Sequence, residues 1–286
     1  MESEVFYKHD AKLGEGIHWD KIKKLIWFVD IHSRTLYSLT LEKELTSYQL
    51  DQKIGWAITV VDKDSLVLGL EEGIALFNPK SNGKIVRWIK RFNKNKNLRL
   101  NDAKVDKFGN IWGGTLNDNN ESKDDGFFFL LTNNGNFEII DKNYYVPNGP
   151  VIIHEEQSVL HTDSAKKTIF KYKIDFNNLS VLEKNIFKQF SVEDGYPDGM
   201  TIDKDGNIYV AMWGEGKIKK LNPAGEEIGT VSLPAKNITN VCFGGEGLNR
   251  LFVTSAKSTN KDLGGSIFEI INHGSVGLNP YQALSL

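Results

Sequence analysis

The sequence predicts an all-β fold, a six-bladed β-propeller, and three observations support this prediction. Pairs of short β-type runs recur around a polar turn rich in Asp, Gly, Asn and Lys, and few windows carry a helical period. Six such pairs account for the length of the chain. The first apolar residues after the six turns are 41 to 49 residues apart: Leu25, Leu66, Ile111, Val159, Ile208 and Leu251. Internal periods of this length, with three or four strands in each unit, indicate propeller blades.

Each repeat is expected to open with two strands joined by the polar turn, because β-branched and aromatic residues flank the turn residues. In chain order these pairs are 16–20 with 25–30, 57–61 with 66–70, 103–106 with 111–115, 151–154 with 159–163, 201–203 with 208–213, and 240–243 with 251–255. A third β-type run follows each pair, at 35–39, 73–77, 127–132, 169–174, 217–221 and 266–270. The pattern therefore predicts a series of antiparallel sheets along the whole chain.

The N-terminal run 4–7 has no partner within the first repeat. We expect it to supply the outer strand of the last blade, because that pairing closes the ring and removes a free sheet edge. No linker or shift in composition separates the repeats, so residues 1–286 are expected to form one propeller domain. The polar, charged segment 116–125 is expected to form a loop over one face of the ring.

Composition narrows the classes of partner and compartment. The chain has 286 residues, 40% of them hydrophobic, with 35 basic and 37 acidic side chains. This near-neutral balance argues against a nucleic-acid partner or an anionic membrane surface. The acidic N-terminus has no apolar signal segment and no window reaches the length of a membrane span, so a cytoplasmic protein is expected. Cys242 is the only cysteine, and its apolar surroundings predict a buried, unreactive thiol.

Three oxygen-bearing side chains lie just before the first strands of different repeats. Glu15 stands between two glycines, Asn148 precedes a glycine, and Asp198 lies between Pro197 and Gly199. In a propeller these segments all meet at one end of the innermost strands, around the central channel. Two carboxylates and an amide oxygen suit one Ca²⁺, Mg²⁺ or Mn²⁺ and can accept Zn²⁺. The alternative is ordinary turn chemistry, since Asn-Gly and Asp-Gly are common turn dipeptides.

The sequence resembles the SMP-30/gluconolactonase/luciferin-regenerating family, which includes regucalcin. The resemblance rests on motifs that keep the family's order over nearly the whole chain: LGEGIHWD at 13–20, RLND at 99–102, NG at 148–149, PDGM at 197–200 and LFVTSA at 251–256. The family implies a six-bladed propeller that carries one divalent metal ion in its central channel. Its members are mostly sugar lactonases, and some hydrolyse other esters or organophosphates.

Carried over residue by residue, the resemblance implies roles for individual side chains. Glu15, Asn148 and Asp198 would bind the metal, and Asp198 would also act as the general base. Arg99 and Asn101 would contact the substrate. Asn119 is a further expected substrate contact, because some members place a substrate-binding Glu at this position of a lid loop.

The expected activity is therefore opening of a small lactone, most simply a sugar lactone, by metal polarisation of the carbonyl and attack of water assisted by Asp198. Two alternatives stay open: an esterase or phosphotriesterase using the same site, and a non-catalytic metal-binding propeller. The chain departs from the family pattern at Ala103, where Gly is usual, and at Ile17, where Pro is usual. These departures affect the choice of substrate more than the metal ligands.

Overall fold

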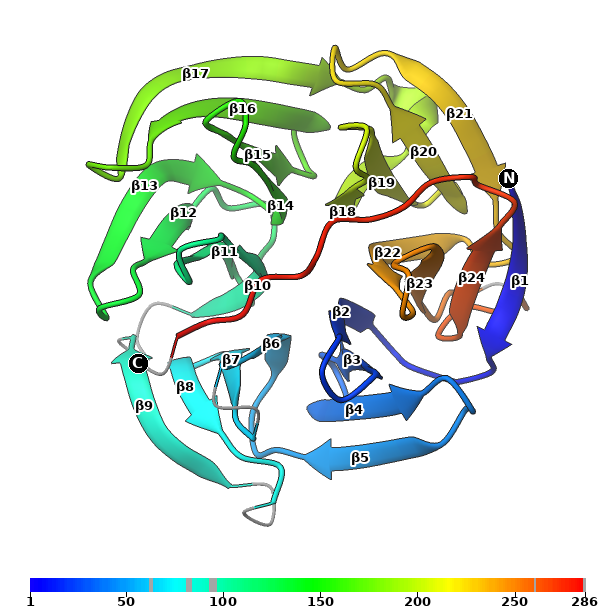
Figure 1. The fold of residues 1–286 in the computed structure, drawn as a ribbon, viewed down its shortest axis with the longest axis horizontal. Helices are drawn as coiled ribbons and strands as arrows, with labels where there is room; N and C mark the ends of the chain where they lie inside the picture. Colours follow the sequence, from blue (N-terminus) through cyan, green and yellow to red (C-terminus); the bar gives the residue numbers. More distant parts are fainter. Residues whose placement is uncertain (62–63, 81–83, 93–96, 260, 285–286) are drawn as a thin grey trace.

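The computed structural model describes residues 1–61, 64–80, 84–92, 97–259 and 261–284. They form an all-β ring of antiparallel sheets around a central channel, a β-propeller (Figure 1). Helix within these ranges is limited to a single 3-10 turn at Val192–Asp194. Correspondingly, no helix in the described part of the chain is long and apolar enough to cross a membrane.

Four of the sheets contain four strands each, in simple up-and-down order. The first comprises β2 (Gly14–Asp20), β3 (Leu25–Asp30), β4 (Thr35–Thr40) and β5 (Leu45–Gln49). The second comprises β6 (Ile54–Thr59), β7 (Leu66–Leu70), β8 (Gly73–Phe77) and β9 (Ile85–Arg91). The third comprises β10 (Leu98–Val105), β11 (Ile111–Asn117), β12 (Gly126–Leu131) and β13 (Phe137–Tyr144). The fourth comprises β14 (Pro147–Ile153), β15 (Ser158–Asp163), β16 (Thr168–Asp175) and β17 (Ser180–Gln189).

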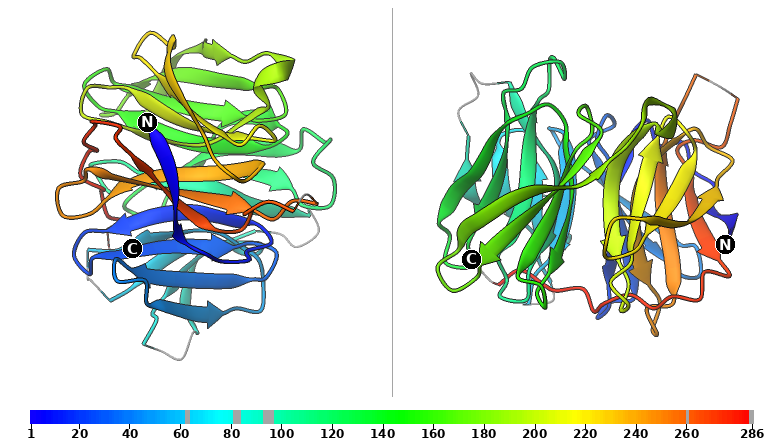
Figure 2. Two further views of the ribbon diagram at one scale, coloured as in Figure 1. Left: turned by 90° about the vertical axis from the view of Figure 1, so that its right-hand side faces the viewer. Right: turned by 90° about the horizontal axis from the view of Figure 1, so that it is seen from above.

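The remaining strands belong to one eight-stranded sheet with two arms. One arm is β18 (Tyr196–Ile202), β19 (Ile208–Trp213), β20 (Lys217–Leu221) and β21 (Glu227–Ser232). The other is β22 (Asn237–Gly244), β23 (Arg250–Ala256), β24 (Ile267–Ile271) and the N-terminal strand β1 (Glu2–Tyr7). A single residue pair, Trp213 with Asn237, joins the arms. The predicted closure is confirmed, because β1 pairs antiparallel with β24 on the outside of the ring (Figures 1 and 2).

An aspartate organises the first turn in several repeats. Asp20, Asp106 and Asp203 each accept backbone N–H groups from the turn residues that follow them. Gly109 and Gly206 occupy the left-handed region in two of these turns, with φ of 85° and 81°. The recurring Asp/Gly/Asn turns in the sequence are therefore the hairpins that connect the two innermost strands of a sheet.

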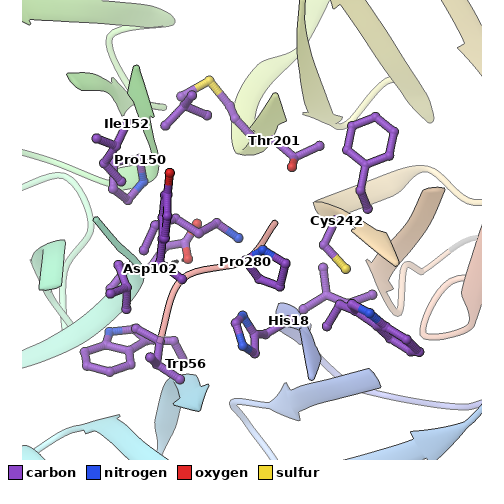
Figure 3. Close-up of a pocket in the computed structure, with 18 of the residues that line it drawn as sticks. His18, Trp56, Asp102, Pro150, Ile152, Thr201, Cys242 and Pro280 are labelled. Atoms are coloured by element: carbon purple, nitrogen blue, oxygen red, sulfur yellow. Dashed lines mark hydrogen bonds between the residues drawn. The ribbon is translucent and has the colours of Figure 1, made fainter. Parts of the chain in front are cut away.

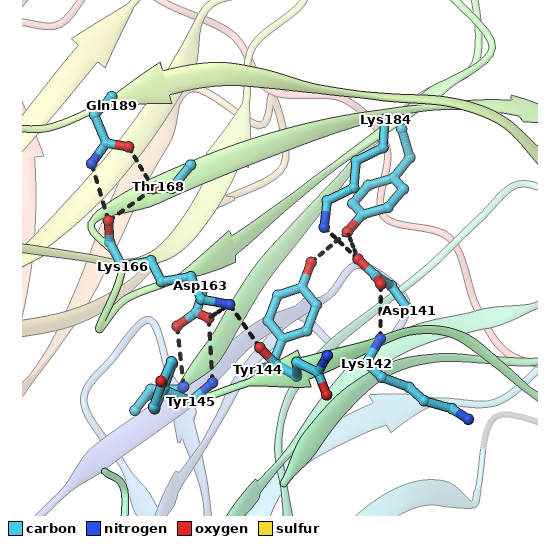
Figure 4. A network of polar contacts seen from close by, with 12 residues as sticks. Asp141, Lys142, Tyr144, Tyr145, Asp163, Lys166, Thr168, Lys184 and Gln189 are labelled. Atoms are coloured by element: carbon cyan, nitrogen blue, oxygen red, sulfur yellow. Dashed lines mark hydrogen bonds and ion pairs between the residues drawn. The ribbon is translucent and has the colours of Figure 1, made fainter. Parts of the chain in front are cut away.

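Apolar side chains fill the spaces between neighbouring sheets, and polar networks join the sheets farther from the axis. In the network of Figure 4, the Tyr144 and Tyr172 hydroxyl oxygens lie 2.5 Å apart, and the Tyr172 hydroxyl donates to Asp141 Oδ2 at 2.6 Å. Lys184 Nζ donates to the same carboxylate oxygen at 2.6 Å. This network ties β13 to β16 and β17, and so holds the third sheet against the fourth.

The C-terminal segment 274–284, named the strap below, crosses one mouth of the central channel (Figures 1 and 2). Gly277 N donates to Leu248 O at 2.7 Å on one side of the ring. On the other side, Ala283 N donates to Thr59 O at 2.9 Å, and Ala283 O accepts from Val61 N at 3.0 Å. The strap therefore connects the β22–β23 hairpin on one side of the channel to the β6–β7 hairpin on the other.

Candidate metal and active site

The innermost strands share an irregularity that shapes the centre of the ring. Their pairing shifts register between Glu15 and His18, Ile54 and Trp56, Leu100 and Ala103, Asn148 and Val151, Pro197 and Met200, and Ile238 and Asn240. A bulge bends a strand and redirects its side chains, and such bulges are common beside active sites. The sequence predicts turns before the strands at these positions. The structure instead extends β2, β14 and β18 through them, so the site residues lie within strands.

Glu15 is buried at the bulge of β2. Its Oε2 accepts the backbone N–H of Gly16 at 2.9 Å and the Asn240 side-chain amide at 3.2 Å. Burial, reinforced by the nearby Asp102 carboxylate, raises the pKa of Glu15 to about 7 against the opposing effect of the two hydrogen bonds. Glu15 is therefore a carboxyl group whose charged form is poorly solvated.

Asp198 is buried at the bulge of β18, and its Oδ1 has no hydrogen-bond partner. Burial raises the pKa of Asp198 well above its usual range, and repulsion from Glu15 and Asp102 adds to the shift. An unpartnered buried polar atom costs about 1–3 kcal/mol. This side chain is thus destabilised as it stands and has an oxygen free to bind a ligand.

Asn148, at the bulge of β14, belongs to a chain of amide contacts. Its Oδ1 accepts the Asn101 amide at 2.9 Å, and its Nδ2 donates to Ser164 Oγ at 2.9 Å. The Asn101 amide also donates to Pro147 O at 2.8 Å. These contacts fix the orientation of both amides, and the carbonyl oxygen of Asn148 keeps a second lone pair for another partner.

Arg99 connects this chain to the edge of the loop after β11. Its NH1 donates to Asn101 Oδ1 at 2.5 Å, and its Nε bonds Asp118 Oδ1 at 2.8 Å. Lys53 Nζ pairs with the other oxygen of Asp118 at 2.6 Å. Asn119 is exposed in the loop next to Asp118, where its backbone N–H donates to Asn117 Oδ1 at 3.2 Å. The structure therefore joins Arg99, Asn101 and Asn148 in one network and leaves Asn119 at the surface.

Two buried residues of this region were not among the predicted site residues. Asp102 accepts the backbone N–H of Ala103 through Oδ1 at 2.8 Å and the Asn240 amide through Oδ2 at 3.1 Å. Burial raises the pKa of Asp102 to about 6. Asp102 was visible as the last letter of the RLND motif, and Asn240 is the polar residue that opens the first strand of the sixth repeat. Neither has a turn dipeptide beside it, so the signal used for the other sites missed both.

The residues present fit one hard divalent cation. Across the described ranges, no cluster of three or more His, Cys, Asp or Glu side chains has the arrangement of a metal centre, but the predicted set contains only two such groups, with an amide oxygen as the third. Repulsion between Glu15 and Asp198 raises the pKa of Asp198, so its charged form is disfavoured. In addition, Asp198 Oδ1 has no hydrogen-bond partner. A divalent cation beside these carboxylates would offset both penalties, since a bound cation inverts the local preference for neutral groups.

A cavity of about 130 Å³ lies farther along the channel, on the side that the strap covers (Figure 3). Asp102 borders it from one strand, and His18, Trp56, Thr201 and Cys242 line its wall. Pro280 of the strap also lines the cavity. Cys242 is buried, and burial raises the pKa of its thiol to about 12, so the prediction of an unreactive thiol is supported.

Curated relatives match most of the chain. YvrE of Bacillus subtilis, which bears a provisional sugar lactone lactonase name, is 29% identical over 86% of this chain and 84% of its own. Pentonolactonase XacC of Haloferax volcanii is 26% identical over 86% of this chain and 82% of its own. Regucalcin of Homo sapiens is 24% identical over 99% of this chain and 98% of its own.

Solved structures match the whole ring. A luciferin-regenerating enzyme superposes with a TM-score of 0.92 at 26% identity, covering 99% of both chains. A regucalcin of Agrobacterium tumefaciens, described as a calcium-binding protein, superposes with a TM-score of 0.90 at 21% identity, covering 99% of this chain and 98% of its own. Residues 13–257 match the family described as SMP-30/Gluconolactonase/LRE-like region. The resemblance carried by the sequence motifs is confirmed, and the chain belongs to the SMP-30/gluconolactonase/LRE-like family.

Proposed function

We propose that this protein is a divalent-metal-dependent lactonase that opens a sugar lactone. Its lactonase-named relatives, YvrE and pentonolactonase XacC, support a sugar lactone as the substrate class. The proposal takes the two arms of the eight-stranded sheet as separate blades, joined by the Trp213–Asn237 pair. With the four smaller sheets this makes a six-bladed ring, with the site at its axis.

We assign Glu15, Asn148 and Asp198 as the ligands of one cation, Ca²⁺, Mn²⁺, Mg²⁺ or Zn²⁺. The observation that carries the assignment is the buried Oδ1 of Asp198, which has no hydrogen-bond partner. The carboxylates of Glu15 and Asp102 lie near enough to repel its negative charge. A divalent cation bound here would polarise the lactone carbonyl and stabilise the negative charge that develops on its oxygen. The regucalcin of Agrobacterium tumefaciens, which is described as a calcium-binding protein, supports a divalent cation.

The chain's own residues would orient the substrate and move the proton. Asp198 would accept a proton from the attacking water through the carboxylate oxygen that the cation leaves free, because the cation would take only its unpartnered Oδ1. Arg99 would present guanidinium N–H donors toward the substrate hydroxyls, and its hydrogen bond to Asn101 limits the entropy lost on binding. Both amide N–H groups of Asn101 already donate to Pro147 O and Asn148 Oδ1, so Asn101 would exchange one of these bonds when it contacts the substrate. Asn119 would contact the substrate from the exposed loop beside Asp118.

The test is a substrate panel followed with a pH indicator, with and without a chelator. A sugar lactone should be hydrolysed, a chelator should abolish this, and returning Ca²⁺, Mn²⁺ or Zn²⁺ should restore it to different extents. Glu15→Gln should weaken cation binding, because it removes one of the two anionic ligands. Full activity in protein shown to be metal-free by elemental analysis would refute the metal centre.

The same panel separates the alternatives. Hydrolysis of an aryl ester or a phosphotriester in preference to every lactone would keep the site and replace the substrate. A tightly bound cation with no hydrolysis of any substrate would indicate a binding propeller without catalysis. A scaffold has no need for the Arg99–Asn101 pair beside an open cation position, so we rank it third.

A further inference from the structure

Asn240 lies beside the proposed ligands, where β22 approaches β2, β10 and β18. It is fully buried in β22. Its Nδ2 donates to Glu15 Oε2 at 3.2 Å and to Asp102 Oδ2 at 3.1 Å, and its Oδ1 accepts the backbone N–H of Val241 at 2.9 Å. A primary amide has two N–H donors, and here each of two buried carboxylates takes one of them.

The same amide also lies against the strand that carries Asp198. A Cβ added at Gly199 would be 2.2 to 2.5 Å from the side-chain carbon, oxygen and nitrogen of the Asn240 amide. Any larger residue at position 199 would displace Asn240. One side chain therefore contacts the acidic segments of β2, β10 and β18, through two hydrogen bonds and one close packing contact.

The chemistry of this position requires a neutral donor. Glu15 and Asp102 are both acceptors when ionised, so a carboxylate at position 240 would add a further negative charge beside them. An apolar residue there would remove one hydrogen bond from each carboxylate and leave only the backbone N–H groups of Gly16 and Ala103. Glu15 Oε2 accepts the Gly16 N–H and the Asn240 amide, and of these two only Asn240 comes from another sheet. The direction of the Glu15 carboxylate thus depends on Asn240.

We propose that Asn240 is a positioning residue, which holds the Glu15 carboxylate in the orientation that binds the cation and couples it to Asp102. This inference rests on the proposed function, because it takes Glu15 as a ligand. Groups that hydrogen-bond to metal-binding carboxylates orient them, and their loss typically weakens metal affinity or activity about 10- to 100-fold. Asn240 acts through Glu15 and touches neither the cation nor the substrate.

The experiment measures binding of Ca²⁺ and Mn²⁺ to the full chain by isothermal titration calorimetry. Two variants remove the donor with different side-chain volumes: Asn240→Leu and Asn240→Ala. The matched control is Asn110→Leu, since Asn110 is also buried and its Nδ2 donates to the Asp106 carboxylate at 2.9 Å in a hairpin turn. Asn110 and Asn240 therefore lose the same kind of hydrogen bond, one of them in a hairpin turn and the other beneath the site.

Both Asn240 variants should bind the cation about 10- to 100-fold more weakly, and Asn110→Leu should bind it as the wild type does. At saturating cation, kcat of the Asn240 variants should return to within a few-fold of the wild type, because all three ligands remain. Folded Asn240→Leu or Asn240→Ala protein that binds the cation within twofold of the wild type would overturn the inference. If the wild type binds no cation at all, the metal centre fails and this inference fails with it.

Discussion

Replacing Asp198 with Asn separates the two tasks that the proposal gives to this residue. The change keeps size and an oxygen ligand but removes one negative charge and the proton acceptor. Asp198 is buried with an unpartnered Oδ1, and burial together with repulsion from Glu15 raises its pKa. A carboxamide carries no charge, so the metal-free Asp198→Asn protein should unfold at a higher temperature than the metal-free wild type.

The effect on catalysis should be large and should persist when the cation site is full. A positioned general base contributes about 10²- to 10⁴-fold, which corresponds to roughly 3–5 kcal/mol in the activation barrier. Loss of one anionic ligand also weakens cation binding, but raising the cation concentration compensates for that loss. The kcat of Asp198→Asn at saturating cation should therefore stay about 10²- to 10⁴-fold below the wild type.

The assay is lactone hydrolysis at saturating cation, with bound cation counted by elemental analysis in each variant. Glu15→Gln is the matched control, since it removes the other anionic ligand and leaves the base in place. Its kcat should recover with added cation. An Asp198→Asn protein with a full cation site and near-normal turnover would show that water attack needs no base at this position, and the proposed mechanism would be wrong even if the lactonase activity survived.

Three other changes test the site, the core and the strap. Arg99→Lys should lower kcat/KM about 10- to 100-fold without changing cation affinity in calorimetry, because a lysine cannot bond Asp118 and Asn101 with one planar fork. His161→Phe should stabilise the fold in urea unfolding at pH 5, because both ring nitrogens of His161 are buried without partners and its ring stacks on Phe128. Burial lowers the pKa of His161 to about 3, so its contribution to stability is full above the unfolded value near 6.5 and is lost as pH falls toward 3. The free energy of unfolding of the variant should therefore fall less steeply with pH in this range, by up to about 1.4 kcal/mol per pH unit. An unchanged dependence on pH would show that His161 is not buried in its neutral form. Gly277→Val should lower Tm by several degrees in thermal unfolding, because a Cβ at 277 would lie 2.3 Å from the Phe243 Cβ, and an unchanged Tm would show that the strap contributes little to stability.

Much of the fold could be predicted because its determinants are local. The innermost hairpins combine apolar strands with Asp-centred turns, and several predicted strands, such as β3 and β19, match the observed bounds. Apart from the N-terminal run 4–7, the outer strands were not predicted individually. Most residues of β17 are exposed, and Lys184 and Lys188 interrupt its apolar residues. Such a strand is formed by pairing with its neighbour β16, and its exposed, mixed composition gives no clear alternation of apolar and polar residues to mark it in the sequence.

The site divides along a similar line. Glu15, Asn148 and Asp198 could be found because each stands beside a glycine in a recurring position, and the structure puts each of them at a bulge of an innermost strand. Asp102 and Asn240 could not be found that way, since their importance comes from contacts across the channel between residues 138 positions apart. A carboxylate that binds a cation is marked by its own chemistry and its neighbours in sequence. The group that orients it is defined by the three-dimensional meeting of strands, so a residue such as Asn240 becomes visible only when the ring is closed.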